Sequence, residues 1–264
     1  MINGTHELTP LHALWLFGAA LMAGALNGVV GGGSFISFPA LLFTGVPPIN
    51  ANATSNTAIW IGMLASVGAY RRDLTNQYRH LVPLVLVSVV GSVAGSLLLL
   101  HTSQATFTRL IPYLLLLATV LFTLSEPFKQ RLQNHQVSAS TASHVFRLGV
   151  LLLQLAIATY GGFFGGGMGI LMLATLSLMG IGTIHTQNAV RAVLSTSINI
   201  TASIPFLLAG VIVWQQAALM AIGAILGGYW SAFYARQLPP KLVRRFVILV
   251  GFIMTLYFFW RSGE

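Results

Sequence analysis

Two glycine triplets, Gly31-Gly32-Gly33 and Gly165-Gly166-Gly167, interrupt long apolar stretches of this sequence. Glycine has a low helix propensity and reaches backbone conformations closed to other residues, so each triplet predicts a break in a helix. A helix that starts after such a break presents free backbone N–H groups and the positive end of its dipole, which together favour an anion. The alternative is close helix packing through small residues, as in Gly24-x-x-x-Gly28. Because the triplets occupy matching places in a repeat, we predict a binding site.

Polar side chains gather shortly after each triplet, within or beside apolar stretches. Helix capping and interfacial loops would account for some of them. An unpaired polar group inside an apolar helix is costly, however, so residues such as Asn56 and Asn199 are expected to face a cavity or another helix. Besides the six glycines and Arg191, the candidate binding residues are Asn27, Ser34, Asn52, Thr54, Ser55, Asn56, Asn188, Ser195 and Asn199.

Arg191 does not lie in one of the longer gaps between apolar segments where most Lys and Arg residues are found. A positive charge near the start of a helix opposes the helix dipole, and no carboxylate lies nearby in the sequence to balance it. A bound anion would supply a partner, whereas the alternative is an arginine that snorkels to the lipid headgroups. His185 could titrate near neutral pH and couple a proton to transport, although a solvated histidine at a helix edge is the simpler interpretation.

Catalytic and metal chemistry have little support in the sequence. There is no Cys, and no pair of His residues has metal-ligand spacing with acidic support, so we expect no metal site and no cofactor. Ser34 could act as a nucleophile only with a base to activate it, and the matching position after the second triplet is Met168. The first triplet also lacks the Lys of a phosphate-binding loop. The four carboxylates lie outside or at the edges of apolar runs: Glu7, Asp73, Glu126 and Glu264.

Composition places these residues in a membrane. Of 264 residues, 56% are hydrophobic and 6% are charged, whereas soluble domains carry about a quarter charged residues. A net charge of +9 does not indicate nucleic acid, because the basic residues lie in short gaps between apolar segments. The predicted segments are Leu11–Val30, Ser34–Gly45, Ala53–Tyr70, Leu81–Leu100, Leu110–Leu124, Phe146–Phe164, Gly169–Gly180, Ala192–Val213, Ala217–Tyr234 and Val243–Trp260.

The second half of the chain repeats the order of the first. When the two triplets are aligned, Ile36 matches Ile170, and Asn52-Ala53 matches Asn188-Ala189 after a two-residue insertion. The sequence thus predicts a first transmembrane repeat at 1–125, a polar cytoplasmic connector at 126–145 and a second transmembrane repeat at 146–264.

The distribution of Lys and Arg predicts that the two repeats have opposite orientations. The gaps 71–79 and 236–245 and the connector region are rich in Lys and Arg, which favours the cytoplasmic side. In the first half, the gap directly after the helix that contains Asn52-Ala53 is rich in Arg. In the second half, the gap directly after the helix that contains Asn188-Ala189 carries no charge, and the next gap, 236–245, is the basic one. Equivalent loops would then lie on opposite sides of the membrane. The predicted fold is an all-α polytopic integral membrane protein, an inverted repeat of two halves, each a glycine-broken helical hairpin plus three transmembrane helices.

Two stretches of each half resemble the sulfite exporter TauE/SafE family of bacterial membrane permeases. In the first half they are residues 27–42, which contain Gly31-Gly32-Gly33-Ser34, and residues 51–55. In the second half they are residues 161–167 and 188–192. The resemblance covers nearly the whole chain and implies a multi-pass permease of the bacterial inner membrane for small sulfur-containing anions. Since Met168 replaces Ser34, the two half-sites cannot contact a ligand identically.

The resemblance and the inverted repeat together predict a secondary transporter and not an enzyme. It would carry a small sulfur-containing anion such as sulfite, a sulfonate or sulfoacetate by alternating access. The same residues could instead line an anion channel, and an intramembrane enzyme is the alternative from another class. The expected partners are the small anion and membrane lipids, with no nucleic acid and with a possible homo-oligomer.

Overall fold

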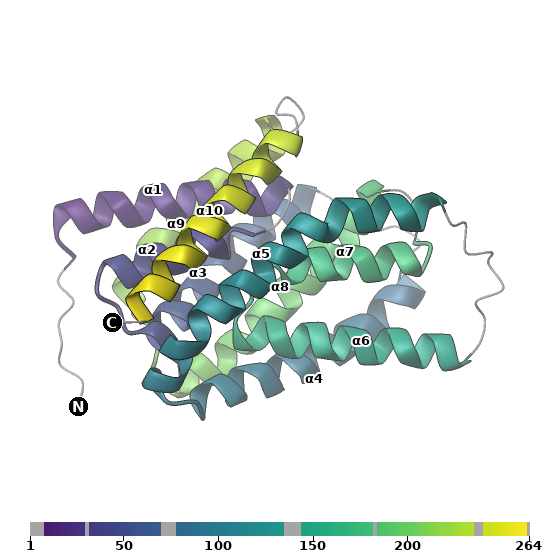
Figure 1. Cartoon of the computed structure of the whole chain (residues 1–264), viewed down its shortest axis with the longest axis horizontal. Coiled ribbons are helices and arrows are strands. Elements are labelled where there is room, and N and C mark those ends of the chain that lie inside the picture. Colours follow the sequence, from purple (N-terminus) through teal and green to yellow (C-terminus); the bar gives the residue numbers. More distant parts are fainter. Residues whose placement is uncertain are drawn as a thin grey trace.

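The structure is a computed structural model that describes residues 8–29, 32–69, 78–134, 144–181, 184–234 and 240–262. These residues form helices joined by short turns, and they contain no strand. The helices, shown in Figure 1, are α1 (Pro10–Val29), α2 (Ser34–Phe43), α3 (Pro48–Ala69), α4 (Tyr78–Leu100), α5 (Gln104–Asn134), α6 (His144–Phe163), α7 (Met168–Leu178), α8 (Ile184–Leu208), α9 (Trp214–Tyr234) and α10 (Pro240–Ser262).

The helices follow the predicted apolar segments, with three informative differences. Helices α3 and α8 begin several residues earlier than the apolar runs, because their polar first turns are helical as well. Proline is well tolerated at the first position of a helix, as Pro48 illustrates. Helix α5 continues to Asn134, so the first part of the predicted connector is helical.

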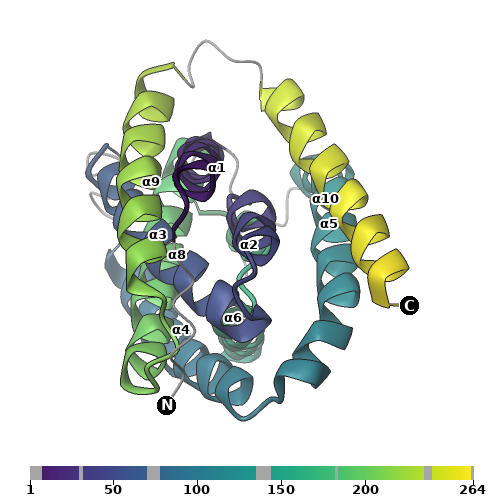
Figure 2. The same cartoon turned by 90° about the vertical axis from the view of Figure 1, so that its left-hand side faces the viewer.

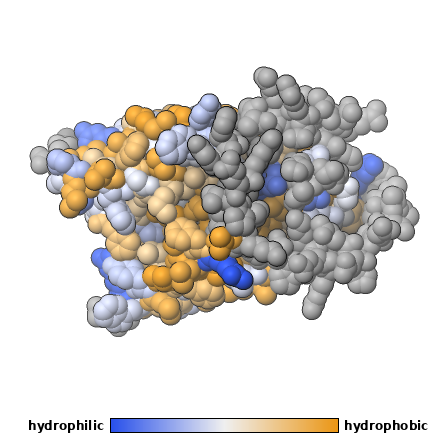
Figure 3. Space-filling model, turned by 90° about the horizontal axis from the view of Figure 1, so that it is seen from above, coloured by the Kyte–Doolittle hydropathy of each residue, from blue (hydrophilic) through white to orange (hydrophobic). Residues whose placement is uncertain are grey.

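Length and polarity make this a multi-pass membrane protein. Five helices are long and apolar enough to span a bilayer, within Pro10–Asn27, Leu81–Leu100, Gln104–Leu124, Phe146–Phe163 and Thr186–Leu208. Helices α3, α9 and α10 are also 21–23 residues long, which is about the 20 residues that a bilayer core requires. Helices α2 and α7 have 10 and 11 residues and reach only about half that thickness. Exposed apolar side chains cover much of the described surface (Figure 3).

The packing of the helices has a two-fold pattern. Helix α1 packs against α9 of the other half, and its counterpart α6 packs against α4. In the same way α3 packs on α9, and its counterpart α8 packs on α4. The pairs α3–α8 and α5–α10 each bring together helices that hold the same place in the two predicted repeats. Figure 1 shows α1 and α6 starting at opposite ends of the molecule. This antiparallel arrangement is what an inverted repeat requires. The inverted repeat itself stays a prediction, as do its boundaries and the side of the membrane that each end faces.

Small residues hold the pairs α1–α9 and α4–α6 together. A Cβ on Gly24 would collide with the Ala224 carbonyl, and one on Gly95 would collide with the Thr159 carbonyl. Gly24 therefore serves close helix packing, which is the role that the Gly24-x-x-x-Gly28 pattern indicated. The glycine triplets lie elsewhere, at the starts of α2 and α7.

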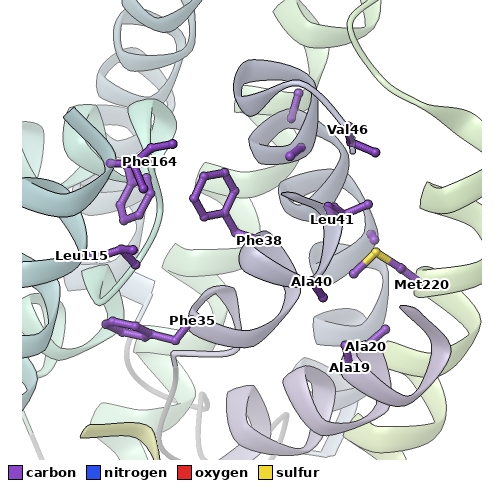
Figure 4. Packing of buried hydrophobic residues seen from close by; sticks show 14 of the residues in the cluster. Ala19, Ala20, Phe35, Phe38, Ala40, Leu41, Val46, Leu115, Phe164 and Met220 are labelled. Atoms are coloured by element: carbon purple, nitrogen blue, oxygen red, sulfur yellow. The ribbon is translucent and has the colours of Figure 1, made fainter. Parts of the chain in front are cut away.

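Aromatic rings fix the position of α2. Phe38 stacks edge-on against Phe164, with ring centroids 5.6 Å apart (Figure 4). Phe35 does so against Phe122 of α5 at 6.1 Å. Figure 2 shows α2 between α9 on one side and the α5–α10 pair on the other. Since Phe164 directly precedes Gly165, its contact with Phe38 holds α2 against the second glycine triplet, Gly165-Gly166-Gly167.

Cysteine labelling tests the predicted topology. The positive-inside pattern predicts that both termini lie outside and that the gap 71–79 is cytoplasmic. Thr5→Cys and Ser262→Cys should each react with an impermeant thiol reagent in intact cells, whereas Asn76→Cys should react only after lysis. The native chain has no Cys to interfere. Labelling of one terminus outside and of the other only after lysis would mean an even number of crossings, which the inverted repeat does not allow.

Candidate anion-binding site

A small cavity lies where the two halves meet, at the starts of α2 and α7. About 20 Å³ of it is open to the centres of water molecules, which is room for roughly one water. Eight of the residues predicted for the binding site line it together: Asn27, Gly32, Ser34, Gly165, Gly167, Arg191, Ser195 and Asn199. The remaining lining residues are Ile59, Met63, Met168 and Gly169.

Arg191 is the charged residue among those that line the cavity. It lies two turns into α8 and is only 2% exposed. Its Nη2 atom donates a long hydrogen bond of 3.4 Å to the Asn27 carbonyl oxygen of α1. Gly169 makes room for it, because a Cβ there would lie 3.2 Å from Nη1. A side chain buried between helices in this way cannot reach the headgroups, so the geometry disfavours snorkelling.

The starts of the two short helices bring backbone donors to the same place. Within the described residues, the amides of Ser34, Met168 and Gly169 have no backbone acceptor. Gly167 precedes α7 with φ +77°, a left-handed conformation that strains any other residue except Asn or Asp. These free N–H groups and the positive dipole ends of α2 and α7 suit an anion.

Two side-chain donors of α8 have only weak acceptors. Ser195 Oγ donates to Met172 Sδ over 3.4 Å, and Asn199 Nδ2 donates to Met63 Sδ over 3.6 Å. A thioether sulfur is a weak acceptor. An anion that took over these donors would exchange weak hydrogen bonds for charge-assisted ones.

Asn52, Thr54 and Ser55 have other contacts in the structure. Asn52 Nδ2 donates to the Phe163 carbonyl over 3.0 Å, Thr54 Oγ1 accepts from the Val213 amide over 3.0 Å, and Ser55 shares a 2.7 Å hydrogen bond with Ser37. None of the three is among the residues that line the cavity. Asn52 and Thr54 thus contact the other half, whereas Ser55 joins α3 to α2 of the same half. The role of these three side chains as ligands of the anion stays a prediction.

The other predicted residues lie around the cavity or outside the described part. Gly33 donates its amide to Asn27 Oδ1 over 2.9 Å, and the Gly166 carbonyl accepts from Tyr160 Oη over 2.7 Å. Asn56 is buried, and its Oδ1 has no partner within the described residues. Asn188 is partly buried in the second turn of α8. Gly31 and the side chain of His185 lie outside what the structure describes.

Four lining residues, Ile59, Met63, Met168 and Gly169, were not predicted as contacts. The duplication contains the signal for two of them. Ile59 and Met63 lie at the same distances after Asn52 as Ser195 and Asn199 lie after Asn188. An apolar residue on a helix gives no sign of a site by itself, so only the repeat could have identified them. The described residues contain no group of three or more His, Cys, Asp or Glu that could hold a metal.

Replacement of Asn52 is expected to change stability more than anion affinity. Asn52→Ala leaves the Phe163 carbonyl at the end of α6 without its side-chain donor, which costs about 1–3 kcal/mol when the group stays buried. The melting temperature of the purified variant should fall, whereas its dissociation constant for the anion should change less than threefold. Asn199→Ala is the matched variant inside the cavity, and it should weaken binding more than it lowers the melting temperature. The reverse pattern would place Asn52 in the binding site.

Comparison with known proteins agrees with this architecture. The sulfite exporter TauE/SafE family matches residues 16–258. A Haemophilus influenzae protein named probable membrane transporter protein is 28% identical over 249 residues, which are 94% of each chain. A Sinorhizobium protein named probable membrane transporter protein ORF9 is 28% identical over 92% of this chain and 90% of its own.

The probable membrane transporter protein YfcA of Escherichia coli K12 is 24% identical over 96% of this chain and 91% of its own. No solved structure matches the chain. The family match spans both glycine triplets, the start of α8 with Arg191 and all the helices that line the cavity. The protein therefore belongs to the sulfite exporter TauE/SafE family and is a membrane transporter.

Proposed function

We propose that this protein is a secondary transporter that moves a small sulfur-containing anion across the bacterial inner membrane by alternating access. Sulfite, a sulfonate and sulfoacetate are the candidate substrates. The observation that carries the proposal is the cavity between the two halves, where a buried arginine meets the starts of two short helices. The name of the family, sulfite exporter TauE/SafE, agrees with the sign of charge that this cavity would accept.

The chemistry of the cavity favours an oxyanion. Arg191 offers a planar fork of donors that fits paired oxygen atoms. Ser195 and Asn199 add side-chain donors from the same face of α8, and the free amides of Met168 and Gly169 add backbone donors from α7. No carboxylate lies among the described lining residues, so no negatively charged side chain there repels an anion.

The small volume of the cavity supports a carrier. It has room for about one water, so a sulfur oxyanion can enter only if the halves move apart on one side. The helices around it come from both halves, and alternating access would require these helices to part on one side of the cavity at a time. Any coupling to protons would go through the substrate or His185, because no carboxylate lies within the described apolar helices that enclose the site.

Counterflow in proteoliposomes tests the proposal. Vesicles with purified protein and a high internal concentration of unlabelled sulfite should accumulate external ³⁵S-sulfite transiently, with an initial rate that saturates. Protein-free vesicles and vesicles with Arg191→Gln should show little of this exchange. A rate that rises linearly with concentration and shows no counterflow would indicate a channel. Absence of any sulfite or sulfonate flux with folded protein would contradict the proposed substrate class.

A further inference from the structure

An open groove lies at the end of the molecule where α4 and α6 begin and α7 ends. Its volume is about 740 Å³, which is within the range of typical ligand pockets, about 300–1,000 Å³. It shares no lining residue with the cavity between the starts of α2 and α7. Arg147 lines the groove together with six apolar residues: Pro83, Leu84, Phe146, Val150, Leu151 and Met179.

The groove lies at the level where two membrane spans begin. The apolar span of α6 starts at Phe146, which lines the groove, and that of α4 starts two residues before Pro83. Helices α4 and α6 pack side by side (Figure 1). Next to the groove, Leu148 and Leu152 of α6 are 58% and 57% exposed, so this face of α6 contacts lipid chains. The groove therefore opens toward the bilayer, close to the level of the headgroups.

Arg147 gives the groove a positive charge at its rim. The residue lies in the first turn of α6, and its side chain is exposed. The apolar stem of an arginine can lie along hydrocarbon while its guanidinium reaches the headgroups. A phosphate beside it would be favoured twice, by the arginine and by the positive end of the dipole of α6.

The predicted repeat has no charge at the equivalent position of the other half. When the two triplets are aligned, Arg147 matches Ala13 of α1. The positive-inside pattern assigns the start of α6 to the cytoplasmic side, and both the connector before α6 and the gap 71–79 before α4 are rich in Lys and Arg. The cytoplasmic leaflet carries anionic lipids, and basic pockets between helices on that side bind their headgroups. Charge complementarity thus favours an anionic lipid.

We propose that this groove binds an anionic phospholipid of the cytoplasmic leaflet. The lipid phosphate contacts Arg147, and an acyl chain lies against Val150, Leu151 and Met179. Because α4 belongs to the first predicted repeat and α6 and α7 to the second, the bound lipid braces the contact between the two. The site is separate from the anion cavity and does not depend on which anion is carried.

A comparison of two lipids with the same chains tests the proposal. Purified, delipidated full-length protein in a neutral detergent is titrated with dioleoylphosphatidylglycerol and with dioleoylphosphatidylcholine. Bound lipid is counted by native mass spectrometry, and the melting temperature is measured in parallel. Phosphatidylglycerol should bind about fivefold more tightly, the effect of one arginine near an anionic lipid. It should also raise the melting temperature more, because a ligand of the folded state stabilises it.

Matched variants assign the effect to the groove. Arg147→Gln should bring the ratio of the two affinities to about one, whereas Arg109→Gln, on an exposed arginine of α5 outside the groove, should keep it. Leu151→Trp fills the groove and should weaken binding of both lipids severalfold. Leu152→Trp changes the neighbouring residue, which does not line the groove, and should have little effect. If Leu151→Trp does not fold, the two arginine variants still decide the question.

Three results would overturn the proposal. The first is equal affinity of the wild-type protein for the two lipids, or an unchanged ratio in folded Arg147→Gln. The second is equally tight binding of glycerophosphoglycerol, which has the same headgroup without acyl chains, since the groove would then have no part in binding. The third is a dimer that Leu151→Trp dissociates and that neither lipid affects, which would assign the groove to a second copy of the chain. None of these readouts involves transport, so each leaves the proposed function untouched.

Discussion

Arg191→Gln should weaken binding of the transported anion by one to two decades. The substitution removes a charge-assisted hydrogen bond, worth about 1.5–3 kcal/mol. Arg191→Lys should recover only part of the loss, because an ammonium group lacks the planar fork that matches two sulfonate oxygens. The measurement is a titration of all three purified proteins in one buffer, because salt screens such interactions. Equal affinities for the wild-type and Gln proteins would place Arg191 outside the site.

Gly169→Ala should shift the Arg191 side chain without removing its charge. A Cβ at this position lies 3.2 Å from Arg191 Nη1 and 3.5 Å from its Cδ, so the guanidinium has to shift by a few tenths of an ångström. Alanine favours a helix over glycine by about 1 kcal/mol, so the melting temperature should not fall. We expect severalfold weaker anion binding in a stable protein. Gly149→Ala on α6 is the control, since a Cβ there meets nothing within 4 Å.

Gly167→Leu should abolish transport. The residue has φ +77°, and a Cβ there would lie 3.2 Å from the Ala118 Cβ and 3.4 Å from its Cα. A leucine therefore strains the backbone by about 1–2 kcal/mol and presses on α5, while the rest of its side chain projects near the cavity. Initial rates of anion uptake, normalised to folded protein, should fall to the level of protein-free vesicles.

Gly210→Leu separates backbone strain from the effect on the site. Gly210 has a similar φ of +65°, and a Cβ on it meets nothing within 4 Å. The variant should lose stability but keep transport per folded molecule. Equal transport by folded Gly167→Leu and Gly210→Leu would leave the second triplet with a packing role only.

Much of the helical arrangement along the chain follows from the sequence. The start of α2 at Ser34 agrees with the prediction, and α7 starts at Met168, one residue before the predicted Gly169, because a glycine triplet precedes each helix. The extension of α5 to Asn134 could not, since its last turns carry polar residues that hydropathy assigns to a loop. Partners such as α1–α9 depend on which small residues meet in space, and periodicity along one helix does not reveal that.

The sequence could predict only part of where the candidate site residues lie, and their role in binding stays a prediction. Glycine triplets and a basic residue outside the basic gaps are visible in a sequence, so the glycines and Arg191 could be singled out as candidates. The depth of Arg191 could not be read from hydropathy, because the polar first turns of α8 resemble a loop. Asn52 and Ser55 look like ligands by residue type, yet the structure pairs them with Phe163 and Ser37. Only tertiary contacts distinguish a polar residue that binds substrate from one that joins two helices.

The position of a bound anion tests the central claim most directly. Methaneseleninate is a selenium analogue of a small organic sulfur anion, and the chain has no Cys with which it could react. Crystals of the protein grown with this compound should give an anomalous selenium peak between the starts of α2 and α7, within hydrogen-bond reach of the Arg191 guanidinium and Ser195 Oγ. A peak bound elsewhere, or a cavity with no peak in crystals of protein that binds the compound in solution, would contradict the assignment of this cavity as the anion site.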